Sequence, residues 1–118
     1  MIELLKKLEM HDVPLNSILI NFKLETLEVI ADGYDDKTSK YFEIAMKFQQ
    51  VQNIQFDKFN LVSLDTEITN LDVQEIDEMF SAHFTFLYLD DNSRTFDLLF
   101  NFQSVLINYP EEKIPHFQ

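Results

Sequence analysis

A ten-residue segment occurs twice in the chain, and it limits the possible folds more than any other feature of the sequence. The first copy is FEIAMKFQQV, residues 42–51, the second is FDLLFNFQSV, residues 96–105, and four of the ten positions are identical. Both copies carry large apolar residues at every second position, which is the period of a β-strand with one buried face. Because each copy follows another apolar segment across an acidic turn, the repeat predicts two versions of one β-hairpin unit.

The predicted fold is mainly β: an antiparallel meander of six or seven strands that forms a curved sheet, a sandwich or a partial barrel. A short helix over residues 1–10 precedes the strands, because Ile2, Leu5 and Leu8 recur at helical spacing. The length of 118 residues indicates a single domain, with hairpin units at 17–48 and 60–109 and an irregular tail at 110–118. The alternative is an α+β sheet with helices on one face.

The alternation also predicts the register of both hairpins. A two-residue turn at Glu25-Thr26 places Leu24 opposite Leu27 and Ile20 opposite Ala31. In the second unit, Tyr88 opposite Phe96 keeps both apolar rows on one side and leaves residues 91–93 as the loop.

Three other segments carry weaker patterns. Residues 32–40 read as an acidic loop, and residues 49–58 read as a link between the two units. Residues 72–80 fit either a helical turn or a strand end with a bulge, and the capping-box pair Asp72 and Glu75 favours the helical turn.

The composition limits the classes of function that the chain can have. The formal net charge of −12 repels nucleic acid and anionic lipid and favours a basic protein partner. The chain has no cysteine, which fits a reducing cytoplasm, and no stretch of membrane-spanning length. The chain has a single glycine, Gly33, and glycine-rich phosphate loops and nucleophile elbows need several, so both are excluded. We therefore expect no enzyme activity and no cofactor.

Two acidic segments are the candidate partner site. Asp35 and Asp36 lie in the loop of the first unit, and Asp90 and Asp91 lie in the loop of the second. If both loops meet at one end of the sheet, these carboxylates form a patch for a basic partner. The spacing DGYDD does not follow the calcium-loop pattern, so no metal site is expected.

His11 and Asp12 form the only adjacent His–carboxylate pair. Such a pair serves as metal ligands in some phosphohydrolases, which need further His and Asp ligands on helices. Neighbouring side chains on an extended chain point apart, so we expect a loop at the helix end in which one of the two bonds to backbone.

Three leucines of the second unit are the candidate self-association site. Leu87, Leu89 and Leu99 fall on the face opposite the phenylalanine rows. Three large aliphatic residues on one face are more than scattered surface leucines explain, so we expect this face to be covered. A two-fold pairing of these patches would cover them, which predicts a homodimer.

The His11-Asp12 opening, the alternating strands and the F-x-x-V of Phe48–Val51 resemble small uncharacterised bacterial domains, some of them similar to immunity proteins of toxin systems. The resemblance covers residues 11–51, and those domains place glycine where this chain has Gln50. It implies a cytoplasmic, non-catalytic binding protein. The alternative is a homo-oligomeric or small-ligand-binding β domain.

Overall fold

The computed structural model describes residues 2–8, 10–59, 65–89 and 94–110, and within them one antiparallel sheet of eight strands follows a single short helix. The mainly-β prediction is therefore confirmed. The elements are α1 (Ile2–Lys7), β1 (Val13–Asn21), β2 (Thr26–Asp35), β3 (Lys40–Gln49), β4 (Gln52–Asp57), β5 (Thr66–Ile76), β6 (Met79–Tyr88), β7 (Thr95–Phe102) and β8 (Ser104–Asn108).

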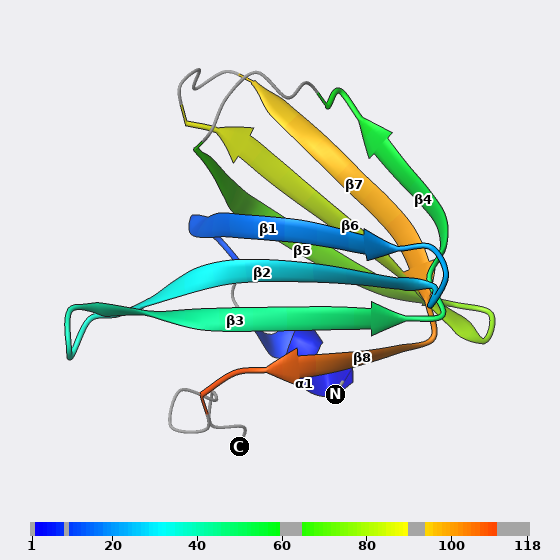
Figure 1. Ribbon diagram of the computed structural model, residues 1–118, viewed down its shortest axis with the longest axis horizontal. Helices are drawn as coiled ribbons and strands as arrows, with labels where there is room; N and C mark the ends of the chain where they lie inside the picture. The colour runs from blue at the N-terminus through cyan, green and yellow to red at the C-terminus, as the bar shows by residue number, and fades with distance from the viewer. Residues whose placement is uncertain (1, 9, 60–64, 90–93, 111–118) are drawn as a thin grey trace.

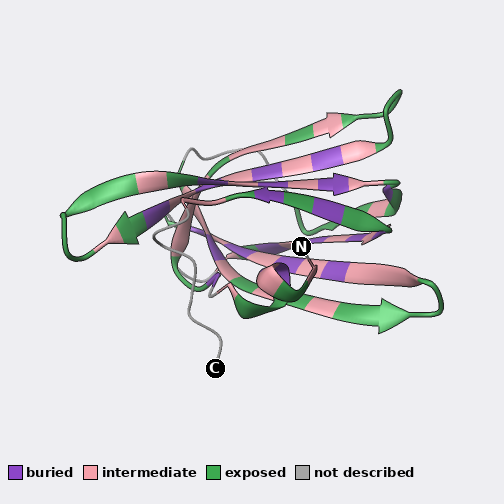
Figure 2. Cartoon of the chain, turned by 90° about the horizontal axis from the view of Figure 1, so that it is seen from below, coloured by how far each residue is buried: buried purple, intermediate pink, exposed green. Residues whose placement is uncertain are grey.

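The strand order β4-β7-β6-β5-β1-β2-β3-β8 divides the sheet into two four-stranded halves. Among the described residues, the halves are joined edge to edge only where β1 meets β5, through the pairs Val13–Ile68 and Pro14–Glu67. The sheet folds over at this seam without closing into a barrel, so its halves lie in two layers whose strands cross at a steep angle (Figure 1). Buried residues are found in both layers (Figure 2).

Each half takes its fourth strand from the other half of the chain. The meander β1-β2-β3 is completed by β8, and the meander β5-β6-β7 is completed by β4. The chain passes from one half to the other after β3 and again after β7. These two connections are in contact, since the Gln103 N–H donates a hydrogen bond of 3.0 Å to the Gln49 carbonyl. The repeat correctly predicted that β3 and β7 are equivalent, but it did not predict this exchange.

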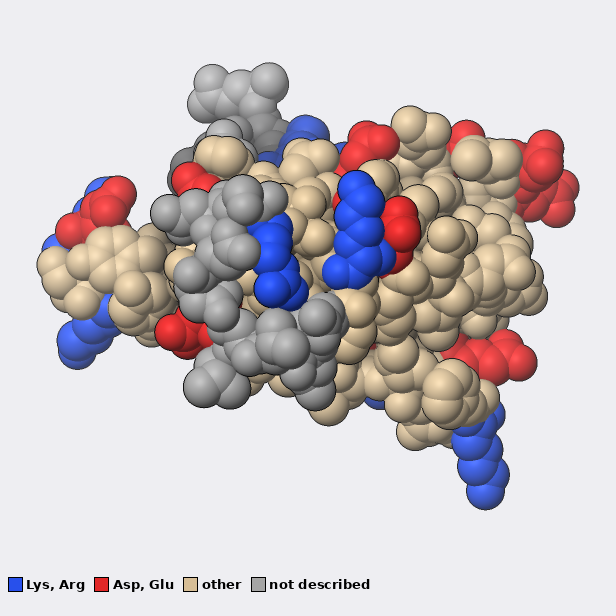
Figure 3. Space-filling view, turned by 90° about the horizontal axis from the view of Figure 1, so that it is seen from above, with Lys and Arg blue, Asp and Glu red and all other residues tan. Residues whose placement is uncertain are grey.

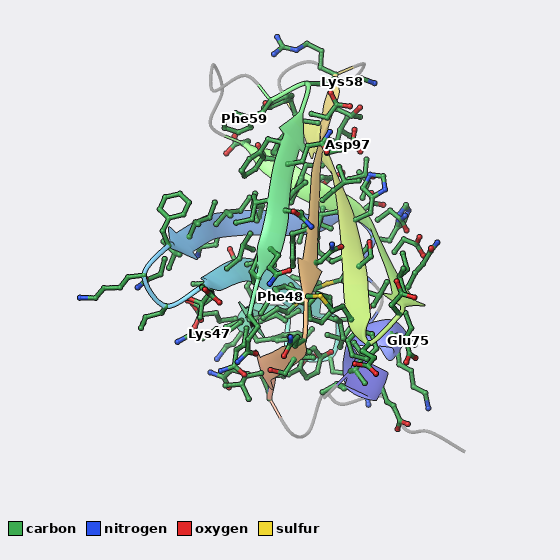
Figure 4. All side chains as sticks on the ribbon, turned by 90° about the vertical axis from the view of Figure 1, so that its right-hand side faces the viewer. Lys47, Phe48, Lys58, Phe59, Glu75 and Asp97 are labelled. Atoms are coloured by element: carbon green, nitrogen blue, oxygen red, sulfur yellow. The ribbon has the colours of Figure 1, made fainter. Side chains whose placement is uncertain are left out.

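The core lies between the two layers and is rich in phenylalanine. The inward rows of the repeat are buried as predicted, apart from Phe42, which is half-buried. The ring of Phe48 in β3 lies 6.0 Å from that of Phe84 and 4.8 Å from those of Phe100 and Phe102, all on the opposite half. Its neighbour Lys47 points to the other side of the strand (Figure 4).

The expected six or seven strands are too few, because two segments form strands through long-range pairing. The expected link at 49–58 contains β4, and residues 104–108 form a separate strand, β8. Residues 72–80 form the end of β5, a turn and the start of β6, so the helical turn was wrong. Asp77 makes this turn with a φ of 55°, a left-handed conformation that aspartate tolerates better than most residues.

Both predicted registers were wrong. The faces were right within the strands, but Phe22 and Leu24, which the alternation assigns to the inner face, lie exposed in the β1–β2 turn. Ile20 lies opposite Leu27, and the β1–β2 turn is the four residues 22–25. Phe86 rather than Tyr88 lies opposite Phe96. The acidic loop at 32–40 is also shorter than expected, because β2 and β3 pair as far as Asp35 and Lys40. Residues 60–64 of the second unit and 111–118 of the tail lie outside the described residues.

Candidate functional site

A cleft lies where residues 10–14 pass the end of the β2–β3 hairpin. It has a volume of about 670 Å3. The following residues line it: Lys7, Leu8, Met10, His11, Asp12, Val13, Pro14, Asp32, Gly33, Tyr34, Asp36, Phe42, Ile44 and Tyr109. We call this site the cleft.

The cleft exists because β1 changes partner. From Leu15 to Asn21, β1 pairs with β2, but Val13 and Pro14 pair with β5 instead. A register shift between Leu15 and Ser17 marks the point of departure. Beyond Ala31, β2 continues beside β3 without β1 at its other edge, and the cleft occupies that side.

The floor of the cleft is apolar and depends on the only glycine. Gly33 faces inward opposite Phe42, and a Cβ placed on Gly33 would lie 2.5 Å from the Phe42 Cζ. The Phe42 ring therefore lies against the bare backbone of β2. Its other neighbour is the ring of Tyr109, edge-on at 5.5 Å between centroids. A glycine inside a strand is a sequence signal for such a close approach.

His11 and Asp12 at the rim do not point apart as expected. Asp12 has a φ of 59°, and this left-handed turn brings its Oδ2 to 3.2 Å from His11 Nε2. His11 Nδ1 lies 2.9 Å from the Thr69 carbonyl, so Nδ1 is the donor. Because both ring nitrogens face acceptors, the Thr69 carbonyl first and then the Asp12 charge raise the pKa of His11.

Glu67 on β5 interacts with Asp12 from outside the lining of the cleft. Desolvation raises the pKa of its carboxyl, and the charge of Asp12 and a hydrogen bond with Asp12 raise it further. The Glu67 carboxyl therefore keeps its proton to a higher pH than an ordinary glutamate does. Among the described residues, no group of three or more His, Cys, Asp or Glu side chains is arranged to hold a metal ion.

The Glu67 shift predicts a pH-dependent stability. Since its folded-state pKa lies above the ordinary value, the group stabilises the fold fully below the ordinary pKa, and this contribution is lost as the pH rises through the raised value. Glu67→Gln should therefore gain stability relative to wild type between pH 4 and pH 7, measured by urea denaturation. Glu75→Gln, at the other end of β5, is the control and should show a smaller change. An unchanged difference for Glu67→Gln across this range would contradict the prediction.

The predicted acidic patch is placed only in part. Asp35 has a structural role, because its carboxylate accepts hydrogen bonds from the Lys37 N–H at 3.0 Å and the Thr38 hydroxyl at 2.9 Å. Asp36 is exposed and lines the cleft. Asp90 and Asp91 lie outside the described residues. The projecting tip of the β2–β3 hairpin carries charges of both signs (Figure 3), so it is not a purely acidic surface.

Sequence reasoning placed Asp32 in the acidic loop, but it missed the pairing of Asp32 with Glu43 and the two tyrosines beside the cleft. Asp32 lines the cleft and lies directly opposite Glu43 of β3, a pairing of like charges that favours neither strand. Next to it, Tyr34 and Tyr41 are 50% and 66% exposed and contact each other edge to face at 5.0 Å. A same-sign pair beside exposed tyrosines could have signalled a binding surface.

The observed register sets the three leucines further apart than the predicted register does. Leu99 lies opposite His83 and Leu87 opposite Thr95, and the row of Thr85 and Asp97 separates the two leucines. Asp97 Oδ1 is 2.9 Å from His83 Nε2 and accepts a hydrogen bond of 3.3 Å from the Thr85 hydroxyl. Leu89 is 43% exposed beyond the end of β6. The register behind the patch was wrong, and the homodimer stays a prediction.

No family model, curated protein or solved structure matches this chain. Within the described ranges, the structure contains no helix with the length and apolar character needed to cross a membrane.

Proposed function

We propose that this chain is a non-catalytic protein-interaction domain that binds a basic protein partner at the cleft. The observation that carries the proposal is the lining of the cleft, in which Asp12, Asp32 and Asp36 surround an apolar floor. Complementary charge speeds association and selects partners, while apolar contacts contribute affinity.

The exposed aromatic pair beside the cleft supports the same partner class. Tyr34 and Tyr41 present ring faces and hydroxyl groups next to Asp32, and the side chains of lysine and arginine are attracted to both carboxylates and rings. Tyrosine is also enriched in protein interfaces. The net charge of −12 adds a long-range attraction for any basic protein.

The resemblance to immunity proteins suggests that the partner is a basic toxin, and the absence of cysteine fits a cytoplasmic location for this encounter. A second candidate function uses the same cleft. Its volume of about 670 Å3 lies within the range of small-ligand sites, so a β domain that carries a small cationic ligand is the alternative.

Two variants with equal charge changes test the proposal. The cleft variant carries Asp12→Asn, Asp32→Asn and Asp36→Asn, and the control variant carries Asp57→Asn, Glu75→Gln and Glu78→Gln, all exposed and outside the cleft. Immobilised protein is exposed to lysate of the source cells, and the retained proteins are identified by mass spectrometry. Basic proteins retained by wild type and control should be lost from the cleft variant.

Each other outcome has a definite meaning. Equal loss from both variants would show that overall charge, not the cleft, retains the partner. Equal retention by all three proteins would contradict the proposal. If only a small molecule is recovered from the wild-type protein, the carrier function is favoured instead.

A further inference from the structure

The edge of β2 beside the cleft has room for another strand. On one side β2 pairs with β3 as far as Asp35–Lys40, but its pairing with β1 ends at Leu15–Ala31. Asp32, Gly33 and Tyr34 thus have a strand neighbour on one side only, within the part of the chain that the structure describes. The backbone N–H and C=O groups along such an edge are a template for an incoming strand.

The chain's own β1 does not fill this place. Pro14 pairs with Glu67 of β5 and has no N–H to donate. The space that β1 would have occupied beside Asp32–Tyr34 belongs to the cleft. An extended peptide can therefore continue the line of β1 without displacing a described strand.

The two outer edges of the sheet are less suitable templates. β4 is interrupted by a register shift between Gln52 and Gln55, where Asn53 has a φ of 57°. Such irregularities commonly block edge pairing. At the other end, α1 packs beside β8 (Figure 1). The β2 edge has neither form of protection in its described surroundings.

We propose that the cleft binds an extended segment of the basic partner, which adds to the sheet as a strand along Asp32–Tyr34. This inference rests on the proposed function and specifies how the partner is held. Main-chain hydrogen bonds give affinity in such complexes, and alternate side chains give specificity.

The pattern of β2 predicts the sequence of the segment. Asp32 and Tyr34 point to the outer face, so the residues beside them on the added strand point outward too and should be lysine or arginine. Gly33 faces the floor formed with Phe42, so the residue beside it points inward and should be apolar. The class of ligand is therefore an extended peptide in which basic and apolar residues alternate.

Synthetic peptides test the strand geometry directly. The probe is a fluorescein-labelled heptapeptide, Thr-Lys-Val-Lys-Val-Lys-Thr, titrated with the protein by fluorescence anisotropy. Two further peptides have the same sequence. In one, the backbone nitrogens of both valines are methylated, and in the other, those of all the lysines are methylated. On an added strand only alternate N–H groups face the edge of β2, so one methylated peptide should bind at least tenfold more weakly while the other stays within about threefold of the parent.

Protein variants locate the binding. Asp32→Asn should weaken binding of the parent peptide at least threefold. Glu43→Gln removes the negative charge directly across from Asp32 on β3, outside the cleft, and should have a smaller effect. Equal effects of the two methylation patterns, whether both peptides bind or both fail, would overturn strand addition. If binding still depends on Asp32 in that case, the acidic cleft remains a partner site. A parent peptide that does not bind also overturns strand addition, and the capture experiment then decides the proposed function separately.

Discussion

Phe48→Ala is expected to lower the free energy of unfolding by about 3–5 kcal/mol, the usual range for truncating a fully buried phenylalanine. Phe48 joins the two layers of the core. Its ring contacts Phe84, Phe100 and Phe102 of the opposite half-sheet, so its loss leaves a cavity between the two layers. Since a domain is stable by about 5–15 kcal/mol, this one change removes a large part of the total. Urea denaturation followed by circular dichroism measures it.

Phe22→Ala is the matched control, because the same atoms are removed from a side chain that is 84% exposed. Its effect should stay within about 0.5 kcal/mol, as for most surface substitutions. A loss below 1 kcal/mol for Phe48→Ala would mean that the two layers do not pack on this ring. A large loss for Phe22→Ala would mean that the β1–β2 turn is covered.

The alternation of apolar residues predicted the faces of the strands, but it could not predict their register. Moving a pairing by two residues keeps every side chain on the same face, so Phe86 or Tyr88 satisfies the pattern equally well opposite Phe96. Turn position decides between them. In the described β1–β2 and β5–β6 turns, Glu25 and Asp77 adopt the left-handed conformation in place of glycine, and such residues give no clear sequence signal.

The strand exchange and the cleft depend on contacts between distant parts of the chain. β4 and β8 are short segments whose pairing partners, β7 and β3, lie in the other half of the sequence. No local pattern distinguishes such a strand from a link. The cleft likewise arises because β1 leaves β2 for β5 at Pro14. The glycine within a strand pattern was a usable sign of the site, although the acidic residues around it favour a loop.

Gly33→Ala should lower the free energy of unfolding by about 1–2 kcal/mol. The added Cβ would meet the Phe42 ring at 2.5–3.0 Å, and overpacking of this kind costs about 1–3 kcal/mol. Reduced freedom of the unfolded chain offsets about 0.4–1 kcal/mol of that loss. The φ of Gly33 is not positive, so an effect of this size would come from the ring and not from backbone strain. Urea denaturation gives the value.

A double-mutant cycle assigns the cause. If the ring of Phe42 is what excludes a side chain at position 33, Gly33→Ala should cost at least 1 kcal/mol less when Phe42→Ala is already present, because the clash is gone. Tyr41→Ala is the control background, since this neighbour points to the outer face and 66% of it is exposed. There the effect of Gly33→Ala should be unchanged. Additive losses in both backgrounds would show that the cost of Gly33→Ala does not come from the Phe42 ring, and then this ring would not be the reason for glycine at position 33.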